Sequence, residues 1–150
     1  MLVVRKAVST DLARLQNLAD QILVGEETQL RVTRSGFALT YVPLKNAEWR
    51  SFPPLCGPMG EAFLQDSENL LLAAYLDENC AGLCAARIMP MGWCELADLR
   101  VDAACRRQGA AHALLSAAES FAQKRGASGL CMTVPDSNAV ICQFLEHNGF

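Results

Sequence analysis

The chain has 150 residues, of which 51% are hydrophobic and 19% charged, and its formal net charge is −3. This length suits a single domain, residues 1–150, with its own core, and the apolar content excludes a disordered chain. The weakly acidic charge disfavours a nucleic-acid partner, and no apolar run is long enough to span a membrane. We therefore expect a cytoplasmic protein without a nucleic-acid or membrane partner.

The first 60 residues predict one strand, one helix and a long loop. Residues 2–8 are an apolar run typical of a strand, and apolar residues recur at helical spacing over 11–24. Residues 26–60 carry prolines and glycines that indicate a loop. This loop also holds four aromatic residues, Phe37, Tyr41, Trp49 and Phe52. They either pack on the core as loop residues or form the wall of a substrate pocket.

The remaining residues predict alternating strands and helices. A short helix is expected to end at 61–65. Strands are predicted at 70–76, 81–89, 93–101 and 129–134, and helices at 110–124 and 138–147. The first three of these strands are joined by short turns, whereas a helix connects the third to the fourth, which predicts a parallel pair there. The fold class is therefore α/β, with a mixed sheet and helices on its faces.

Seven scattered cysteines and two distant histidines argue against a metal site. We interpret the cysteines as reduced packing residues.

The segment after the strand at 93–101 has the properties of an anion-binding loop. Arg106 and Arg107 precede Gly109, and the next helix begins with the small residues Ala110 and Ala111. The first N–H groups of a helix lack internal partners and carry partial positive charge, so a diphosphate suits this position. The sequence lacks the Gly-Lys-Ser/Thr of a P-loop and the three glycines of a dinucleotide fingerprint.

The pattern Arg106-x-x-Gly109-x-Ala111 after a long strand resembles the pyrophosphate loop of the GNAT superfamily of N-acetyltransferases. Asn138-Ala139, then Phe144 and Asn148-Gly149-Phe150, resemble its second signature. The resemblance is strong over 69–150 and covers 1–68 only by element order. It implies a GNAT-like fold and acetyl-CoA as co-substrate.

The resemblance also implies roles for individual residues. Backbone groups of the strand at 93–101 would pair with the pantetheine arm of acetyl-CoA. Amides of the following loop and helix would hold its diphosphate. The implied cofactor-binding residues are Leu99, Arg100, Val101, Arg106, Arg107, Gln108, Gly109, Ala110, Ala111 and His112, with Asn138 near the thioester. Asn138 is also a candidate helix N-cap. In the family, a tyrosine in the last helix often protonates the departing thiolate. The resemblance places Phe144 at that position, and Phe144 has no proton to give.

A general base, which removes a proton from the attacking amine, is expected on the strand at 93–101, close to the acyl group. The resemblance implies Glu95 as the leading candidate, because it lies six residues before Val101, where several family members carry a catalytic glutamate. In a regular strand Glu95 would share a face with Ala97, Leu99 and Val101. Asp98, on the opposite face, is the rival.

We expect an N-acetyltransferase that transfers acetyl to a primary amine of a small molecule or peptide. The alternatives are a non-catalytic module that binds or senses acyl-CoA, and a plain interaction domain. Family members usually continue after Gly-Phe with a hairpin of two strands, so we expect a fold that is C-terminally short. The strand at 129–134 would then be an exposed edge, which favours a homodimer.

Overall fold

The computed structural model describes residues 1–54 and 60–150, and these form two compact units. The first unit comprises Met1–Asp20 and Pro53–Thr133, and the second comprises Gln21–Phe52 and Val134–Phe150. The single domain expected from the sequence stays a prediction.

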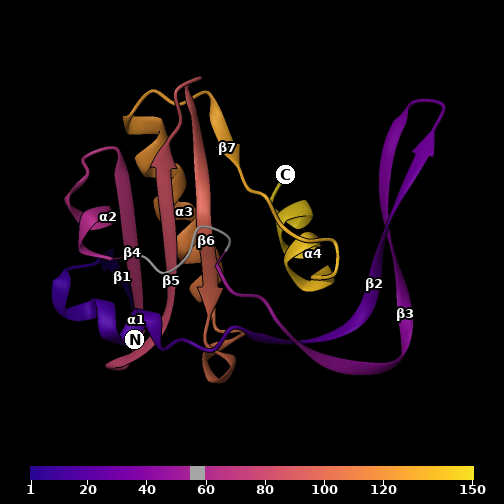
Figure 1. Ribbon diagram of the computed structural model, residues 1–150, viewed down its shortest axis with the longest axis horizontal. Coiled ribbons are helices and arrows are strands. Elements are labelled where there is room, and N and C mark those ends of the chain that lie inside the picture. The colour runs from indigo at the N-terminus through magenta and orange to yellow at the C-terminus, as the bar shows by residue number, and fades with distance from the viewer. Residues whose placement is uncertain (55–59) are drawn as a thin grey trace. The chain divides into compact units, whose positions relative to one another are not determined.

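The first unit is built on a five-stranded mixed sheet (Figure 1). Its strands are β1 (Leu2–Lys6), β4 (Asn69–Leu76), β5 (Asn79–Ile88), β6 (Trp93–Val101) and β7 (Gly129–Cys131), in the order β1-β4-β5-β6-β7. Only β6 and β7 run parallel, because α3 connects them, whereas the other neighbours are antiparallel. The predicted mixed sheet and its parallel pair are therefore confirmed.

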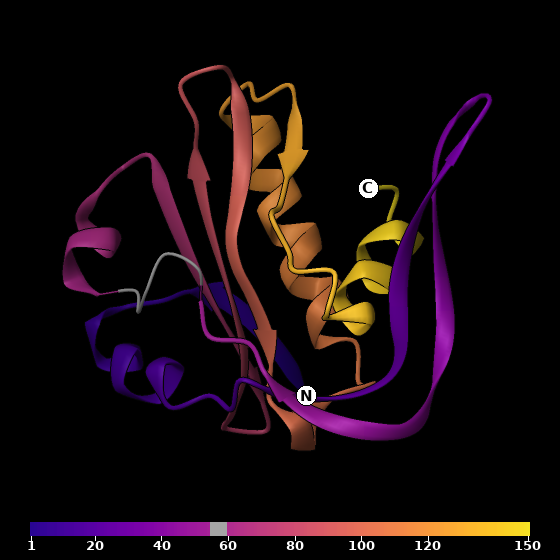
Figure 2. The same cartoon turned by 45° about the vertical axis from the view of Figure 1, so that its right-hand side comes forward.

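Helices cover both faces of this sheet (Figure 2). Helix α3 (Ala110–Lys124) packs on one face, where its Leu114 lies against Gly82 of β5. The other face carries the turn η1 (Ser9–Asp11), helix α1 (Leu12–Gln16) and helix α2 (Glu61–Gln65). A second turn, η2 (Ala103–Cys105), links β6 to the loop before α3.

The second unit is a hairpin with one helix. Strands β2 (Gln21–Thr33) and β3 (Gly36–Ser51) pair antiparallel, and α4 (Ala139–His147) packs against β2. The hairpin is tied to α4 by hydrogen bonds from Tyr41 to Glu146 (2.7 Å) and from Gln143 to Glu26 (3.2 Å).

Two predictions for the N-terminal segment are wrong. The helix expected over 11–24 ends at Gln16, and the loop expected over 26–60 is largely the β2–β3 hairpin, with residues 55–59 outside the described ranges. The period-two alternation on both sides of Ser35-Gly36 was the signal that indicated strands. Gly25 and Pro43 do not break the hairpin, because they lie at an irregularity in the pairing.

The expected shortage of two strands is not supported. The described residues form seven strands, β6 and β7 among them, and two of these come from the segment predicted as a loop. Strand β7 does lie at the sheet edge, as expected, but it ends at Cys131 rather than at residue 134.

Candidate active site

A β-bulge in β6 changes which side chains share a face. Leu96 pairs with Ala86 and Asp98 pairs with the next residue back, Ala85, so Ala97 is an extra residue in the ladder. Glu95, Asp98 and Arg100 consequently point to one face, and Leu99 and Val101 point to the other. The prediction that Glu95 shares a face with Ala97, Leu99 and Val101, opposite Asp98, is therefore wrong.

The face with Asp98 borders a cleft of about 410 Å³. The end of α1 and the residues after it form one wall, and side chains of β4, β5 and β6 form the floor. The lining residues are Leu15, Gln16, Asn17, Leu18, Ala19, Asp20, Pro54, Leu71, Leu83, Asp98 and Arg100. The cleft therefore combines apolar and polar residues, with Asp20 in the wall and the Asp98–Arg100 ion pair in the floor.

That ion pair joins Asp98 and Arg100, whose nearest charged atoms lie 3.2 Å apart. Both side chains are nearly buried, with 12% and 11% of their surface exposed. Burial raises the pKa of Asp98 because it disfavours the charged carboxylate, and Arg100 opposes this effect. Arg100 also donates a hydrogen bond to the carbonyl of Leu18 (3.5 Å). The cleft thus holds a carboxylate able to take up a proton at a higher pH than an ordinary aspartate.

Glu95 is engaged differently. Its carboxylate accepts a hydrogen bond from Arg87 of the neighbouring strand at 2.7 Å, and it is not part of the cleft lining. Its pairing partner on the other side is Cys131 of β7.

Strands β6 and β7 separate soon after they meet. Strand β7 pairs only with Trp93, Cys94 and Glu95. Within the described ranges, Leu99–Val101 therefore pair with β5 and have no strand beside them on their other edge. An extended polar chain can occupy such an edge by hydrogen bonding to the backbone.

The loop after β6 is ordered by its own side chains. Asp102 accepts a hydrogen bond from the backbone N–H of Ala104 (3.0 Å), and Arg106 donates to the carbonyl of Val101 (3.2 Å). Arg107 and Gly109 both have left-handed backbone angles, with φ of 62° and 86°. These bonds and angles turn the chain sharply into α3.

The N-terminus of α3 fits an anion. Gly109 is its N-cap residue and no side chain caps the helix, so the amides of its first turn are not used by a cap. A Cβ built on Gly109 would meet no atom within 4 Å, so the space before the helix is open. Arg107, Gln108 and His112 are exposed around this space. The residues predicted to hold the diphosphate are thus consecutive around one helix end, and the donors suit it.

The residues predicted from the second signature lie in the other unit. Asn138 is 5% exposed and caps α4 by accepting a hydrogen bond from the Ile141 N–H at 3.1 Å, which confirms its expected capping role. Its contact with a cofactor stays a prediction. Phe144 is a partly buried residue of α4.

Over residues 1–54 and 60–150, no group of three or more His, Cys, Asp and Glu side chains could hold a metal ion. In the same ranges, no helix is both long and apolar enough to cross a bilayer. The six cysteines that the structure describes are free thiols.

Sequence reasoning missed the cleft because its walls come from separate segments. Leu15 and Leu18 carried a helical signal, yet nothing in the sequence placed them opposite Leu71 and Leu83. The bulge at Ala97 left no recognisable pattern either.

A family model described as the acetyltransferase (GNAT) family matches residues 41–150. Nourseothricin acetyltransferase is structurally similar, with a TM-score of 0.81 and 23% identity over 99% of this chain and 82% of that chain. A comparison with curated protein sequences found no match.

Two further solved structures are similar. One was assigned as a streptothricin acetyltransferase from Bacillus anthracis str. Ames and was solved in complex with acetyl coenzyme A. Its TM-score is 0.88 at 18% identity, over 99% of this chain and 84% of that chain. The ribosomal-protein-S18-alanine N-acetyltransferase from Escherichia coli has a TM-score of 0.65 at 18% identity, over 99% and 77%. At these identities the likeness shows a shared fold.

Proposed function

Because the chain belongs to the acetyltransferase (GNAT) family, we propose that it transfers acetyl from acetyl-CoA to a primary amine of a small molecule. The uncapped N-terminus of α3 behind the open, left-handed Gly109 is the observation that carries the proposal, since it suits a diphosphate.

The loop and the open edge of β6 would hold the acetyl donor. Amides from Arg107 to His112 would bind its diphosphate, and Arg106 would brace the loop through its bond to Val101. Backbone groups of Leu99–Val101 would pair with its amide-bearing arm. When bound, acetyl-CoA supplies the thioester whose carbonyl carbon the amine attacks.

The acceptor would bind in the cleft beside Asp98. An amine is protonated near neutral pH and must lose a proton before its lone pair can attack. Asp98 lines the cleft and burial raises its pKa, so its carboxylate is placed to hold the ammonium and to accept this proton. Arg100 would keep the carboxylate oriented by their ion pair.

Glu95 remains a candidate base. The bulge brings it to the same face as Asp98, but its carboxylate is paired with Arg87 and it does not line the cleft. It could accept the proton only through intervening water. We therefore place Asp98 before Glu95 in the proposed mechanism.

The names of the similar proteins support a small-molecule acceptor. Two of them are named for nourseothricin and streptothricin, and another solved structure is an aminoglycoside acetyltransferase in complex with sisomicin. The E. coli protein, in contrast, is named for the alanine of a ribosomal protein. The mixed lining, with the acidic residues Asp20 and Asp98 among apolar side chains, suits a compact amine with apolar carbon atoms.

One residue, Phe144, supports a second candidate function. Phe144 stands where many family members have a tyrosine that protonates the departing thiolate. A chain without that acid could bind acyl-CoA without transferring its acyl group, as a sensing module would. The thiol of coenzyme A is acidic enough for coenzyme A to depart as a thiolate without a protonating residue. We therefore favour an acetyltransferase over a sensing module.

Binding is tested with a matched pair of glycine variants. Gly109 and Gly126 flank α3, both have positive φ, and neither would meet an atom within 4 Å if a Cβ were added. Gly109→Ala and Gly126→Ala should therefore lose similar stability, about 1–2 kcal/mol from backbone strain. Only Gly109→Ala should weaken acetyl-CoA binding measured by titration calorimetry. Equal affinities of the two variants for acetyl-CoA would contradict the proposed diphosphate site at the amides from Arg107 to His112.

Catalysis is tested with Asp98→Asn and Glu95→Gln on a panel of antibiotic and simple amines. We expect Asp98→Asn to lower kcat by roughly 10²–10⁴-fold, the usual contribution of a general base, while acetyl-CoA still binds. Glu95→Gln should change kcat far less. The opposite ranking would return the base to Glu95, and binding without any acetylation by the unmodified chain would favour the sensing module.

A further inference from the structure

The cleft beside β6 contains an acidic side chain that the proposed reaction does not use. Asp20, which follows α1, lines the cleft together with Asp98 and Arg100, and these three are the only charged residues of its lining within the described ranges. Over residues 1–54 and 60–150, no basic side chain forms an ion pair with Asp20. Asp20 is partly exposed, so a small molecule in the cleft can reach it.

The charge of Asp98, in contrast, is already compensated by a cation. One terminal nitrogen of Arg100, Nη2, lies 3.2 Å from the Asp98 carboxylate, and the other, Nη1, donates a hydrogen bond to the carbonyl of Leu18 at 3.5 Å. The guanidinium is therefore engaged at both of its ends. Two carboxylates and one guanidinium give the lining a formal charge of −1, and Asp20 carries the part that is not compensated.

The same contacts hold the backbone that carries Asp20. Leu18 is 7% exposed and belongs to the core cluster with Leu71 and Leu83, and Arg100 binds its carbonyl oxygen. Asp20 lies two residues further along the chain, and two residues span at most about 7 Å. The carboxylate of Asp20 is therefore kept at a limited distance from the Asp98–Arg100 pair.

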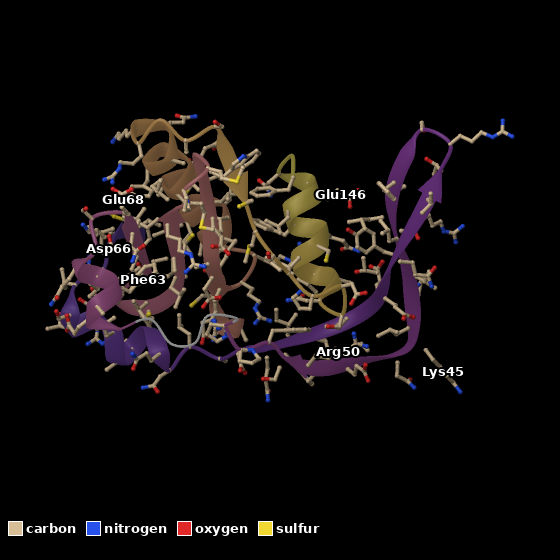
Figure 3. All side chains as sticks on the ribbon, turned by 45° about the horizontal axis from the view of Figure 1, so that its top comes forward. Lys45, Arg50, Phe63, Asp66, Glu68 and Glu146 are labelled. Carbon is tan, nitrogen blue, oxygen red and sulfur yellow. The ribbon has the colours of Figure 1, made fainter. Side chains whose placement is uncertain are left out.

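Neighbouring acidic residues of this unit have partners within the fold. Figure 3 labels two of them, Asp66 and Glu68, which follow α2. Asp66 accepts a hydrogen bond from the backbone N–H of Glu68 at 2.9 Å, and the carboxylate of Glu68 pairs with Arg125. These two carboxylates stabilise the fold, whereas Asp20 lines a cleft. This difference indicates that the carboxylate of Asp20 serves a ligand.

We propose that Asp20 selects the acceptor by binding a second cationic group of an amine whose reacting nitrogen lies at Asp98. The proposal rests on the proposed function, because it assigns the acceptor to the same cleft. A carboxylate in a partly closed cleft of about 410 Å³ attracts an ammonium or guanidinium group more strongly than a carboxylate in open water. Asp98 cannot supply this contact, because it takes up the proton of the reacting amine. The favoured acceptors are therefore compact diamines and polycations.

The first test measures acetylation of putrescine, hexamethylenediamine and octamethylenediamine against butylamine, hexylamine and octylamine. At the best-fitting length, the KM of the diamine should be about tenfold below that of the matching monoamine, as expected for one charge-assisted hydrogen bond. Asp20→Asn should remove this difference by raising the KM of the diamine, with kcat unchanged, because Asp20 does not contact the reacting nitrogen. The preference should also shrink at high salt.

Glu119→Gln is the matched control. Glu119 is an exposed acidic residue of α3 in the same unit and does not line the cleft, so this variant removes the same charge elsewhere. It should leave every KM unchanged, and urea unfolding checks that both variants fold. The proposal is overturned if the unmodified chain does not prefer diamines, or if Asp20→Asn changes that preference no more than Glu119→Gln does.

A binding measurement separates this proposal from the proposed function. Titration calorimetry with hexamethylenediamine and hexylamine, without acetyl-CoA, measures the acceptor site alone. If the diamine binds about tenfold more tightly and Asp20→Asn abolishes the difference, but neither amine is acetylated, Asp20 binds the cation and the acetyltransferase activity is refuted. If both amines bind equally and are acetylated equally, the acetyltransferase stands and the role of Asp20 is refuted.

Discussion

Replacing Gly82 by alanine should weaken the junction between β5, β6 and α3. A Cβ at Gly82 would lie 2.5 Å from the carbonyl oxygen of Arg100, 3.3 Å from the Cα of Val101 and 3.3 Å from Cδ1 of Leu114. Nonbonded heavy atoms attract at about 3.5–4.0 Å, so the first contact is strongly repulsive. Two of the three neighbours are backbone atoms, so relief requires β5 and β6 to move apart.

The expected loss follows from two opposing effects. Overpacking a core site usually costs about 1–3 kcal/mol, whereas replacing glycine by alanine returns about 0.4–1 kcal/mol by restricting the unfolded chain. We expect a net loss of about 1.3 kcal/mol for Gly82→Ala, which lowers the midpoint of urea unfolding by roughly 0.6 M at an m-value of about 2 kcal/mol/M. Because Arg100 and Val101 also belong to the proposed donor-binding edge, acetyl-CoA affinity should fall as well.

Gly25→Ala is the matched control. A Cβ there would meet only Ala47, at 4.0 Å, and Gly25 lies in the hairpin of the second unit. This variant should be as stable as the unmodified chain or slightly more stable. If Gly82→Ala and Gly25→Ala unfold at the same urea concentration, the close approach of β5 and β6 is not what the structure describes.

Three further outcomes are expected. Asp11→Ala should cost about 2–3 kcal/mol in urea unfolding, because the buried carboxylate accepts hydrogen bonds from Arg5 and Tyr75. These bonds hold the pKa of Asp11 well below its usual value. Their contribution to stability is therefore complete above about pH 4 and is lost as the pH falls through the lowered pKa. The free energies of unfolding of the unmodified chain and of Asp11→Ala should converge in acid. The acetylation rate should rise with pH through the raised pKa of Asp98, and Asp98→Asn should remove this rise from the kcat/KM profile. Gly129→Ala should displace the half-exposed Trp93 ring, which lies 2.7 Å from the added Cβ, and shift tryptophan emission with a stability loss below about 1 kcal/mol.

The sequence predicted the second half of the fold well. Strand β6 and helix α3 have the predicted bounds, because a long alternating or helical pattern there ends at clear turn residues. The segment after α1 was harder to interpret, since its glycines and prolines resemble loop punctuation although they occupy an irregular hairpin. Local pattern cannot distinguish these two cases, because the partner strand decides between them.

The candidate site divides in the same way. The proposed diphosphate site consists of consecutive residues, Arg107 to His112, so the sequence alone is enough to suggest it. The relation of Glu95 and Asp98 depends on one extra residue in β6, and a period-two pattern cannot show a bulge that only the pairing with β5 reveals. The cleft depends on segments that are far apart in the chain, so it needed the structure.

The proposed diphosphate site at the N-terminus of α3 also affects which amino-acid substitutions this chain can tolerate. Its proposed ligands are peptide N–H groups, which every residue except proline supplies whatever its side chain. Substitutions at exposed positions such as Gln108 and His112 can therefore accumulate without removing a single donor. A proline scan would reveal the site where an alanine scan stays silent.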